Sequence, residues 1–228
     1  MSSRDKILAK VRAGAPGGET KGPGYDDERA RTVAARLAGH PRHAVPERAR
    51  DKTPEERVAL LRKWLEMAGG ELVEVSGSNA VPGAVTGFLR RHSLPQQVRM
   101  GGDARLGAMP WAGEAQLQVV RGRAEPDDMT SVTHALAAVA ETATVLVPSG
   151  PDNPVTLSFL PENNIVVVCR ADVVGPLEDA LARLREAHGG AMPRTLNLIS
   201  GPSRSADVGG IPVLGAHGPK RLCVVVVG

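Results

Sequence analysis

Aromatic residues are scarce in this sequence: only 2% of its 228 residues are Phe, Trp or Tyr. Proteins that bind single-stranded nucleic acid stack several aromatic rings along a basic groove. Here the basic residues are spread along the chain, and the net charge is only +3. The composition therefore argues against nucleic acid as a partner and is compatible with a small anionic ligand.

Cysteine and cofactor motifs are also scarce. The two cysteines, Cys169 and Cys223, lie far apart in two apolar runs, so they cannot supply the four ligands of a zinc or iron–sulfur site. The sequence has no P-loop, no HExxH and no GxGxxG after a predicted strand. We therefore expect reduced, buried thiols and no cofactor or metal bound by this chain.

Long apolar runs are absent as well. No stretch reaches 18 uninterrupted apolar residues, and the opening MSSRDKILAKVRAG lacks the apolar core of a signal peptide. The expectation is a cytoplasmic protein without a membrane span.

The first fifty residues predict an arm rather than a domain. Residues 3–13 have helical apolar spacing, residues 14–24 form a Gly- and Pro-rich linker, and residues 25–39 again favour a helix. We predict an N-terminal helical arm and linker over residues 1–50 and an α/β domain over residues 51–228.

From Thr53 onward, helices and strands alternate. Thr53-Pro-Glu-Glu56 is a helix start, with a capping Thr, an N-terminal Pro and a Glu at the third position. The helix that begins there is predicted over residues 54–68, and three more helices over residues 81–91, 130–140 and 173–188. Strands are predicted over residues 71–75, 97–100, 116–120, 143–148, 164–169, 195–200, 211–214 and 221–227.

The runs VLV, IVVV and CVVVV are apolar on both faces, which is typical of central parallel strands covered by helices. The predicted fold is therefore a three-layer α/β domain with a mostly parallel sheet flanked by helices. The last three strands follow one another without helices, so that end of the sheet should be mixed or carry a hairpin.

The densest polar segment is Ser200-Gly-Pro-Ser-Arg-Ser-Ala-Asp207, directly after a predicted strand. Open α/β sheets bind ligands at the carboxyl ends of their strands. Ser203 and Ser205 offer hydroxyls, and Arg204 offers a guanidinium fork suited to carboxylate or phosphate. Asp207 could orient Arg204 or accept a substrate hydroxyl. The alternative is a surface turn with an internal Arg–Asp pair.

Three further segments carry candidate side chains. In Gly215-Ala-His-Gly-Pro-Lys-Arg221, His217 could face a ligand beside Lys220, although the segment could equally be a plain hairpin turn. Glu141, at the end of the helix predicted over 130–140, could be a base, a nucleophile or an arginine partner, or an exposed helix-end carboxylate. The loop 148–154 is predicted to form a shaped rim, with Asp152 or Asn153 as hydrogen-bonding groups.

Taken together, three segments resemble the lactate utilization protein C family, also called the LUD domain. They are TATVLVPSGPDNPVTLSFLPENNIVVVCRADVVG, ISGPSRSADV and VLGAHGPKRLCVVVV, and the opening SSRDKILAKVRAG fits the family's first helix. The sequence departs from the family at Ala143, where Gly is frequent, and at Gly209-Gly210, near which the family often has an acidic residue. Any role that this acidic residue has in the family therefore cannot be assigned to a residue of this sequence.

The resemblance implies a fold like that of sugar-phosphate isomerases and CoA transferases (NagB/RpiA/CoA-transferase-like). It also implies a part in the oxidation of L-lactate to pyruvate, beside partner proteins that carry iron–sulfur clusters. Because this chain has no redox motif of its own, any electrons from lactate would have to pass through such a partner.

The leading hypothesis is a non-redox subunit of an L-lactate-oxidising complex. Arg204 would bind the substrate carboxylate in a pocket with Ser203, Ser205, Asp207 and Lys220, and Glu141 or His217 would accept the proton. The alternatives are an independent isomerase or CoA-transferase-like enzyme acting on a phosphorylated or acyl substrate, with Glu141 as nucleophile or base, and a metabolite-sensing scaffold. Whether the chain forms a homodimer is left open.

Overall fold

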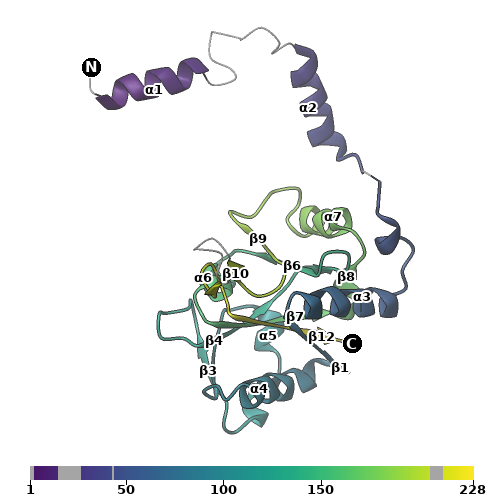
Figure 1. The fold of residues 1–228 in the computed structure, drawn as a ribbon, viewed down its shortest axis with the longest axis vertical. Coiled ribbons are helices and arrows are strands. Elements are labelled where there is room, and N and C mark those ends of the chain that lie inside the picture. The colour runs from purple at the N-terminus through teal and green to yellow at the C-terminus, as the bar shows by residue number, and fades with distance from the viewer. Residues whose placement is uncertain (1–2, 15–26, 43, 206–212) are drawn as a thin grey trace. The chain divides into compact units, whose positions relative to one another are not determined.

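The computed structural model describes residues 3–14, 27–42, 44–205 and 213–228. The chain divides into two compact units, Met1–Ala44 and Val45–Gly228. The first unit contains the helices α1 (Ser3–Gly14) and α2 (Asp27–Gly39). The second, which we call the α/β unit, contains all the strands (Figure 1). None of the described helices is long and apolar enough to cross a membrane.

The main sheet of the α/β unit has six strands in the order β1-β12-β7-β4-β2-β3, and all of its pairs are parallel. The strands are β1 (Glu71–Val75), β2 (Gln97–Met100), β3 (Gln118–Arg121), β4 (Thr130–His134), β7 (Asn163–Cys169) and β12 (Arg221–Val227). The apolar runs of β7 and β12 occupy the centre, which confirms the prediction for these two runs and for a mostly parallel sheet flanked by helices.

A second, four-stranded sheet has the order β8-β5-β6-β9 and is mixed. Its strands are β5 (Ala137–Val139), β6 (Thr144–Pro148), β8 (Val173–Val174) and β9 (Leu196–Ile199). β6 contains the VLV run, so the prediction that this run is a central parallel strand is wrong. Its neighbours β5 and β9 are both antiparallel to it.

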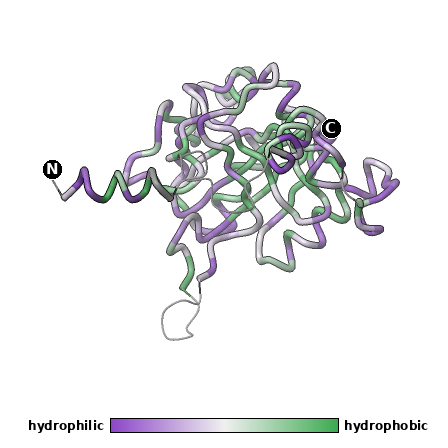
Figure 2. Tube along the Cα trace, turned by 90° about the horizontal axis from the view of Figure 1, so that it is seen from above, coloured by the Kyte–Doolittle hydropathy of each residue, from purple (hydrophilic) through white to green (hydrophobic). Residues whose placement is uncertain are grey.

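Helices cover the sheets on several sides (Figure 1). α4 (Val81–Arg91) packs on one face of the main sheet, whereas α3 (Pro54–Met67) and the second sheet share the opposite face. α7 (Leu177–Ala187) covers the outer face of the second sheet. The short helices are α5 (Ala104–Gly107), α6 (Thr156–Phe159), and 3-10 turns at Glu47–Ala49, Ser78–Ala80, Trp111–Gly113 and Arg170–Asp172. In Figure 2 the hydrophobic segments gather inside the α/β unit.

The start of α3 forms as predicted. The Thr53 hydroxyl accepts the Glu56 N–H at 3.2 Å, and the Glu56 carboxylate accepts the Thr53 N–H at 2.8 Å. This reciprocal capping box satisfies two backbone donors that have no partner inside the helix.

Two helix predictions are wrong. Residues 130–140 form β4 and β5 instead of a helix, and every residue of both strands is buried. A strand buried on both faces shows no alternation, so periodicity cannot separate it from a helix. The helix predicted over 173–188 begins only at Leu177, because β8 and the break at Gly175-Pro176 come first.

The last three predicted strands belong to three different sheets. β9 lies at the edge of the second sheet, and β12 lies in the middle of the main sheet. Between them, β10 (Arg204–Ser205) and β11 (Val213–Leu214) form a small antiparallel pair of their own. Residues 211–212 of the predicted strand lie outside the described residues.

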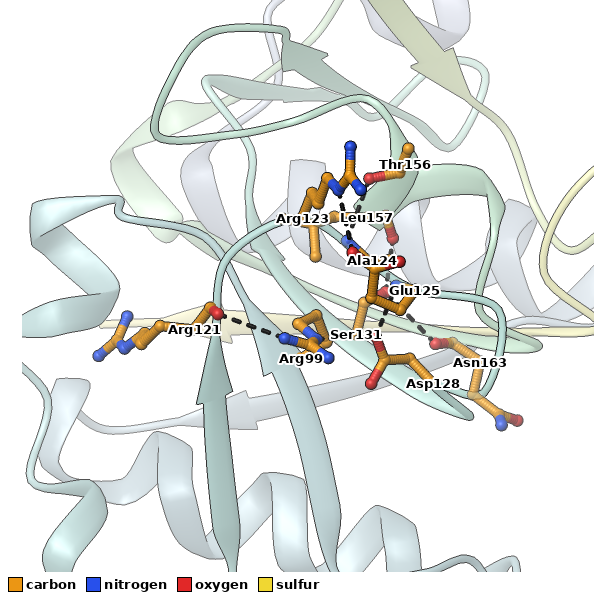
Figure 3. A network of polar contacts seen from close by, with 10 residues as sticks. All are labelled: Arg99, Arg121, Arg123, Ala124, Glu125, Asp128, Ser131, Thr156, Leu157 and Asn163. Carbon is orange, nitrogen blue, oxygen red and sulfur yellow. Dashed lines mark hydrogen bonds and ion pairs between the residues drawn. The ribbon is translucent and has the colours of Figure 1, made fainter.

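A polar network connects the segment before β4 to strand β2 and helix α6 (Figure 3). The buried Asp128 carboxylate accepts the Arg99 Nε–H and the Glu125 backbone N–H, each at 2.7 Å. The Thr156 hydroxyl accepts the Ala124 N–H at 3.1 Å. These bonds give the entry to β4 a fixed path across the edge of the sheet.

Candidate functional site

The two loops singled out in the sequence interlock. The Ser203 hydroxyl accepts the His217 backbone N–H at 3.1 Å. The Ser203 backbone N–H donates to the Pro219 carbonyl at 2.8 Å, and its carbonyl accepts the Gly215 N–H at 3.0 Å. Ser203 and His217, which are separated by thirteen residues in the sequence, are therefore held together.

Arg204 is placed by a glycine at the end of α3. A Cβ added to Gly69 would lie 1.9 Å from Nη2 of Arg204, and Gly69 has a φ of +83°. The positive φ favours glycine here, and an added Cβ would also displace the tip of the Arg204 side chain. The guanidinium has no hydrogen bond or ion pair with any described residue, and the side chain is exposed. Among the described residues, nothing occupies this guanidinium, so it can contact a ligand anion.

The other predicted binding residues are arranged differently. Lys220 is on the His217 loop, but its Nζ lies 2.6 Å from Oε1 of Glu162. Ser205 is half-buried in β10, opposite Val213. Asp207 lies outside the described residues.

Glu141 is in the turn between β5 and β6, not at the end of a helix. Its side chain is 12% exposed, and Oε1 lies 3.2 Å from Nη2 of Arg48. Its backbone N–H donates to the Gly175 carbonyl at 3.2 Å. Its observed ionic partner is thus Arg48, and the structure does not bring its carboxylate to Arg204. Ala143 in the same turn has a φ of +49°, a conformation that favours glycine.

The interlocked loops lie at the amino edge of the main sheet. The segment 215–220 directly precedes β12, and Gly69 lies two residues before β1. The segment that begins at Ser200 does follow the carboxyl end of a strand, as predicted. The strand that leads into the Ser–Arg loop, β9, belongs to the second sheet and is antiparallel to its neighbour β6.

A separate pocket of about 200 Å³ opens at the carboxyl edge of the main sheet. Its walls come from the N-terminus of α5, the end of β4, the loop 148–153 and His188. The loop was predicted as a rim, and it does line this pocket. The other polar groups, Asp103, Arg105 and His134, were missed.

His134 is the buried polar group of this pocket. It is 3% exposed, and Nδ1 lies 2.7 Å from the Ala135 carbonyl oxygen. Since a carbonyl can only accept, Nδ1 carries the proton in this bond. Burial, and then the charge of Arg105, lower the pKa of His134. The neutral ring therefore presents Nε2 as a hydrogen-bond acceptor.

Acidification should destabilise the protein partly through His134. Its pKa in the folded state lies below the ordinary 6.5, so just below pH 6.5 the unfolded chain binds more protons and folding stability falls as the pH falls. Urea denaturation at pH 7.5 and 5.5 should show a larger loss of unfolding free energy for the wild type than for His134→Gln. His188→Gln, at an exposed ring, should behave like the wild type. An equal loss in His134→Gln would contradict the assignment.

Both thiols have a raised pKa, which disfavours the thiolate form. Burial raises the pKa of Cys223 to about 12. Burial, followed by the charge of Asp172, raises that of Cys169. Both cysteines are free. Within the described ranges, no three His, Cys, Asp or Glu side chains are grouped so that they could hold a metal ion.

One sequence feature could have predicted the pocket at the carboxyl edge. Gly101-Gly102-Asp103 directly follows the strand 97–100, which is the position where open α/β sheets place ligand-binding loops. His134 was hidden by the wrong helix prediction over 130–140, which removed it from the end of a strand.

Comparisons with known proteins agree with the sequence motifs. Residues 128–227 match the model of the LUD domain family. The chain is 35% identical over 98 residues to a lactate utilization protein C from Geobacillus sp. (strain WCH70), covering 42% of this chain and 41% of that protein. It is 36% identical over 107 residues to one from Halalkalibacterium halodurans, covering 46% of each. The matches thus span less than half the length of these relatives.

A solved structure shows the same fold over a longer stretch. The crystal structure of a DUF162 family protein from Deinococcus radiodurans superposes with a TM-score of 0.60 at 22% identity, covering 78% of this chain and 99% of that one. At this identity the likeness concerns the fold. The family match and the relatives confirm the resemblance found in the sequence: residues 128–227 of this chain are similar to the LUD domain family.

Proposed function

We propose that this chain takes part in lactate utilization as a substrate-handling, non-redox subunit of an L-lactate-oxidising complex. The relatives named lactate utilization protein C support the pathway. The anion site of the proposal is the interlocked loop pair at the amino edge, with Ser203, Arg204, Ser205 and His217, and with Asp207 and Lys220 on the same segments.

The observation that carries this proposal is that Arg204 has no ionic partner among the described residues. A guanidinium binds a carboxylate through two parallel N–H donors, and such charge-assisted pairs are stronger than neutral hydrogen bonds. Arg204 is held against Gly69 without a described ionic partner. A small carboxylate that binds Arg204 therefore displaces no acid of the described residues.

Oxidation of a 2-hydroxy acid removes the hydroxyl proton and, from C2, a second proton with two electrons. In the proposal, His217 accepts the hydroxyl proton, and its backbone N–H bond to the Ser203 hydroxyl keeps this residue on the loop pair. The electrons go to iron–sulfur centres of partner proteins. We assign the clusters to partners because the two cysteines of this chain are too few for a four-cysteine site.

The alternative, an independent enzyme with Glu141 as nucleophile, has less support. Its carboxylate lies 3.2 Å from the Arg48 guanidinium, and a nucleophile held in an ion pair is stabilised in its resting form.

Calorimetric titration with L-lactate tests the proposal. We expect saturable binding by the wild type and a loss of affinity of tenfold or more in Arg204→Ala, since a hydrogen bond to a charged group contributes about 1.5–3 kcal/mol. Arg123→Ala is the matched control, because Arg123 is an exposed arginine on another loop. Absence of lactate binding by the wild type, or equal affinity in Arg204→Ala, would refute this site.

A further inference from the structure

We propose that the pocket at the carboxyl edge is a second small-molecule site that binds a small protonated amine, with His134, Asp152 and Asn153 as the acceptors of its N–H groups. This site does not depend on the lactate proposal, because neither the Ser203 loop nor the His217 loop contributes to its lining.

The unpartnered nitrogen of His134 points to a ligand. No described residue hydrogen-bonds Nε2, although His134 is only 3% exposed and lines the pocket. Nε2 is not among the buried side-chain atoms that lack a partner, so this nitrogen is open to the pocket. Because Nδ1 already donates to the Ala135 carbonyl, Nε2 can accept a hydrogen bond from a donor in the pocket.

The charges of the lining favour a cation. Arg105 binds Asp103 with both Nε (3.0 Å) and Nη2 (2.6 Å), so these two charges largely neutralise each other. The Asp152 carboxylate has no hydrogen bond or ion pair with any described residue. With a neutral His134, the lining therefore carries an excess negative charge, which would repel a carboxylate ligand.

The loop that carries Asp152 is held in place by contacts within the protein. Gly150 and Asn153 exchange backbone hydrogen bonds at 3.2 and 3.1 Å, and Ser149 pairs with Thr195 through both its N–H and its hydroxyl. The loop rests on Gly101, where an added Cβ would lie 2.1 Å from the Asp152 carbonyl oxygen. Such preorganisation lowers the entropic cost of binding.

The side chains of the loop complete the acceptor set. The Asn153 Nδ2 donates to the Pro148 carbonyl at 2.9 Å, which assigns the other amide atom, Oδ1, as the acceptor. A primary ammonium has three N–H donors, one for each of the acceptor groups of His134, Asp152 and Asn153. The pocket volume of about 200 Å³ equals roughly seven waters, so the ligand has only a few heavy atoms.

Three small two-carbon probes test this inference: the cation of ethanolamine, neutral ethylene glycol and the anion glycolate. Binding is followed by NMR of protein labelled with 15N in histidine, and the His134 signal is assigned by its absence in His134→Gln. We expect ethanolamine to shift the His134 signal saturably in the millimolar range, as suits so small a ligand. Glycolate should bind at least about tenfold more weakly.

Three variants test whether the charge of Asp152 contributes to the binding of the amine. Asp152→Asn should lower the affinity for ethanolamine about tenfold, to that of ethylene glycol, whereas Asp127→Asn, an exposed acid outside the lining, should leave it unchanged. Arg204→Ala should also leave it unchanged, which distinguishes this site from the lactate site. No saturable shift with ethanolamine, or equal binding of glycolate, would overturn the proposal.

Discussion

Phe88→Ala is expected to lower the free energy of unfolding by about 3–5 kcal/mol, the range for truncating a buried aromatic ring. Phe88 is completely buried in the cluster between α4 and the main sheet, where its neighbours include Leu89, Val98 and Met100. Its ring also lies 4.6 Å from the His92 ring, centroid to centroid. The surrounding side chains are packed in the same cluster, so they can only partly fill the cavity that the missing ring leaves.

Urea denaturation of Phe88→Ala beside Phe159→Ala measures this effect. Phe159 is the same residue type in the same chain, but it is 43% exposed, so its truncation should cost less than about 1 kcal/mol. Similar losses in the two variants would mean that burial does not determine the contribution of these rings.

Asp128→Ala is expected to cost about 3 kcal/mol, the lower end of the range for breaking a buried ion pair. The carboxylate is 5% exposed and accepts bonds from Arg99 and Glu125 (Figure 3). Without it, the Arg99 guanidinium loses its anion in a half-buried position, and the Glu125 N–H loses its acceptor. Chemical denaturation at pH 7.5 gives the loss directly.

A neighbouring ion pair provides the control. Glu125 pairs with Arg123 at 2.9 Å, but the Glu125 side chain is 49% exposed, so Glu125→Ala should change stability by less than about 1 kcal/mol. The double variant Arg99→Met, Asp128→Ala should recover part of the loss, because no unpaired charge remains. A loss in Asp128→Ala no larger than in Glu125→Ala would contradict a buried pair.

The sequence predicted those parts of the fold that local chemistry determines. Thr53 and Glu56 form the capping box that their spacing indicates, and the apolar runs of β7 and β12 lie at the centre of the sheet. The wrong predictions concern features that depend on distant segments. A similar apolar run forms β6, which lies in the second sheet between the antiparallel strands Ala137–Val139 and Leu196–Ile199. No local sequence pattern specifies these partners.

For the candidate sites too, residues in a recognisable loop could be predicted, whereas contacts between distant segments could not. Ser203 and His217 were identified as polar residues in Gly- and Pro-rich loops, and the structure joins them. Glu141 was assigned from an assumed helix, and its observed partner is Arg48. His134 could not be recognised, because its exposure to a pocket depends on Arg105 and the loop 148–153, which are distant in sequence.

The position of β12 has a consequence for biosynthesis. Within the main sheet β12 is translated last, yet it pairs with β1 along Glu71–Val75 on one side and with β7 along Asn163–Cys169 on the other. Until it leaves the ribosome, β1 and β7 each expose an unpaired edge, and such edges recruit other chains. The main sheet therefore cannot be completed until β12 has been synthesised. A chaperone that covers the exposed edges of β1 and β7 would be most useful before that point.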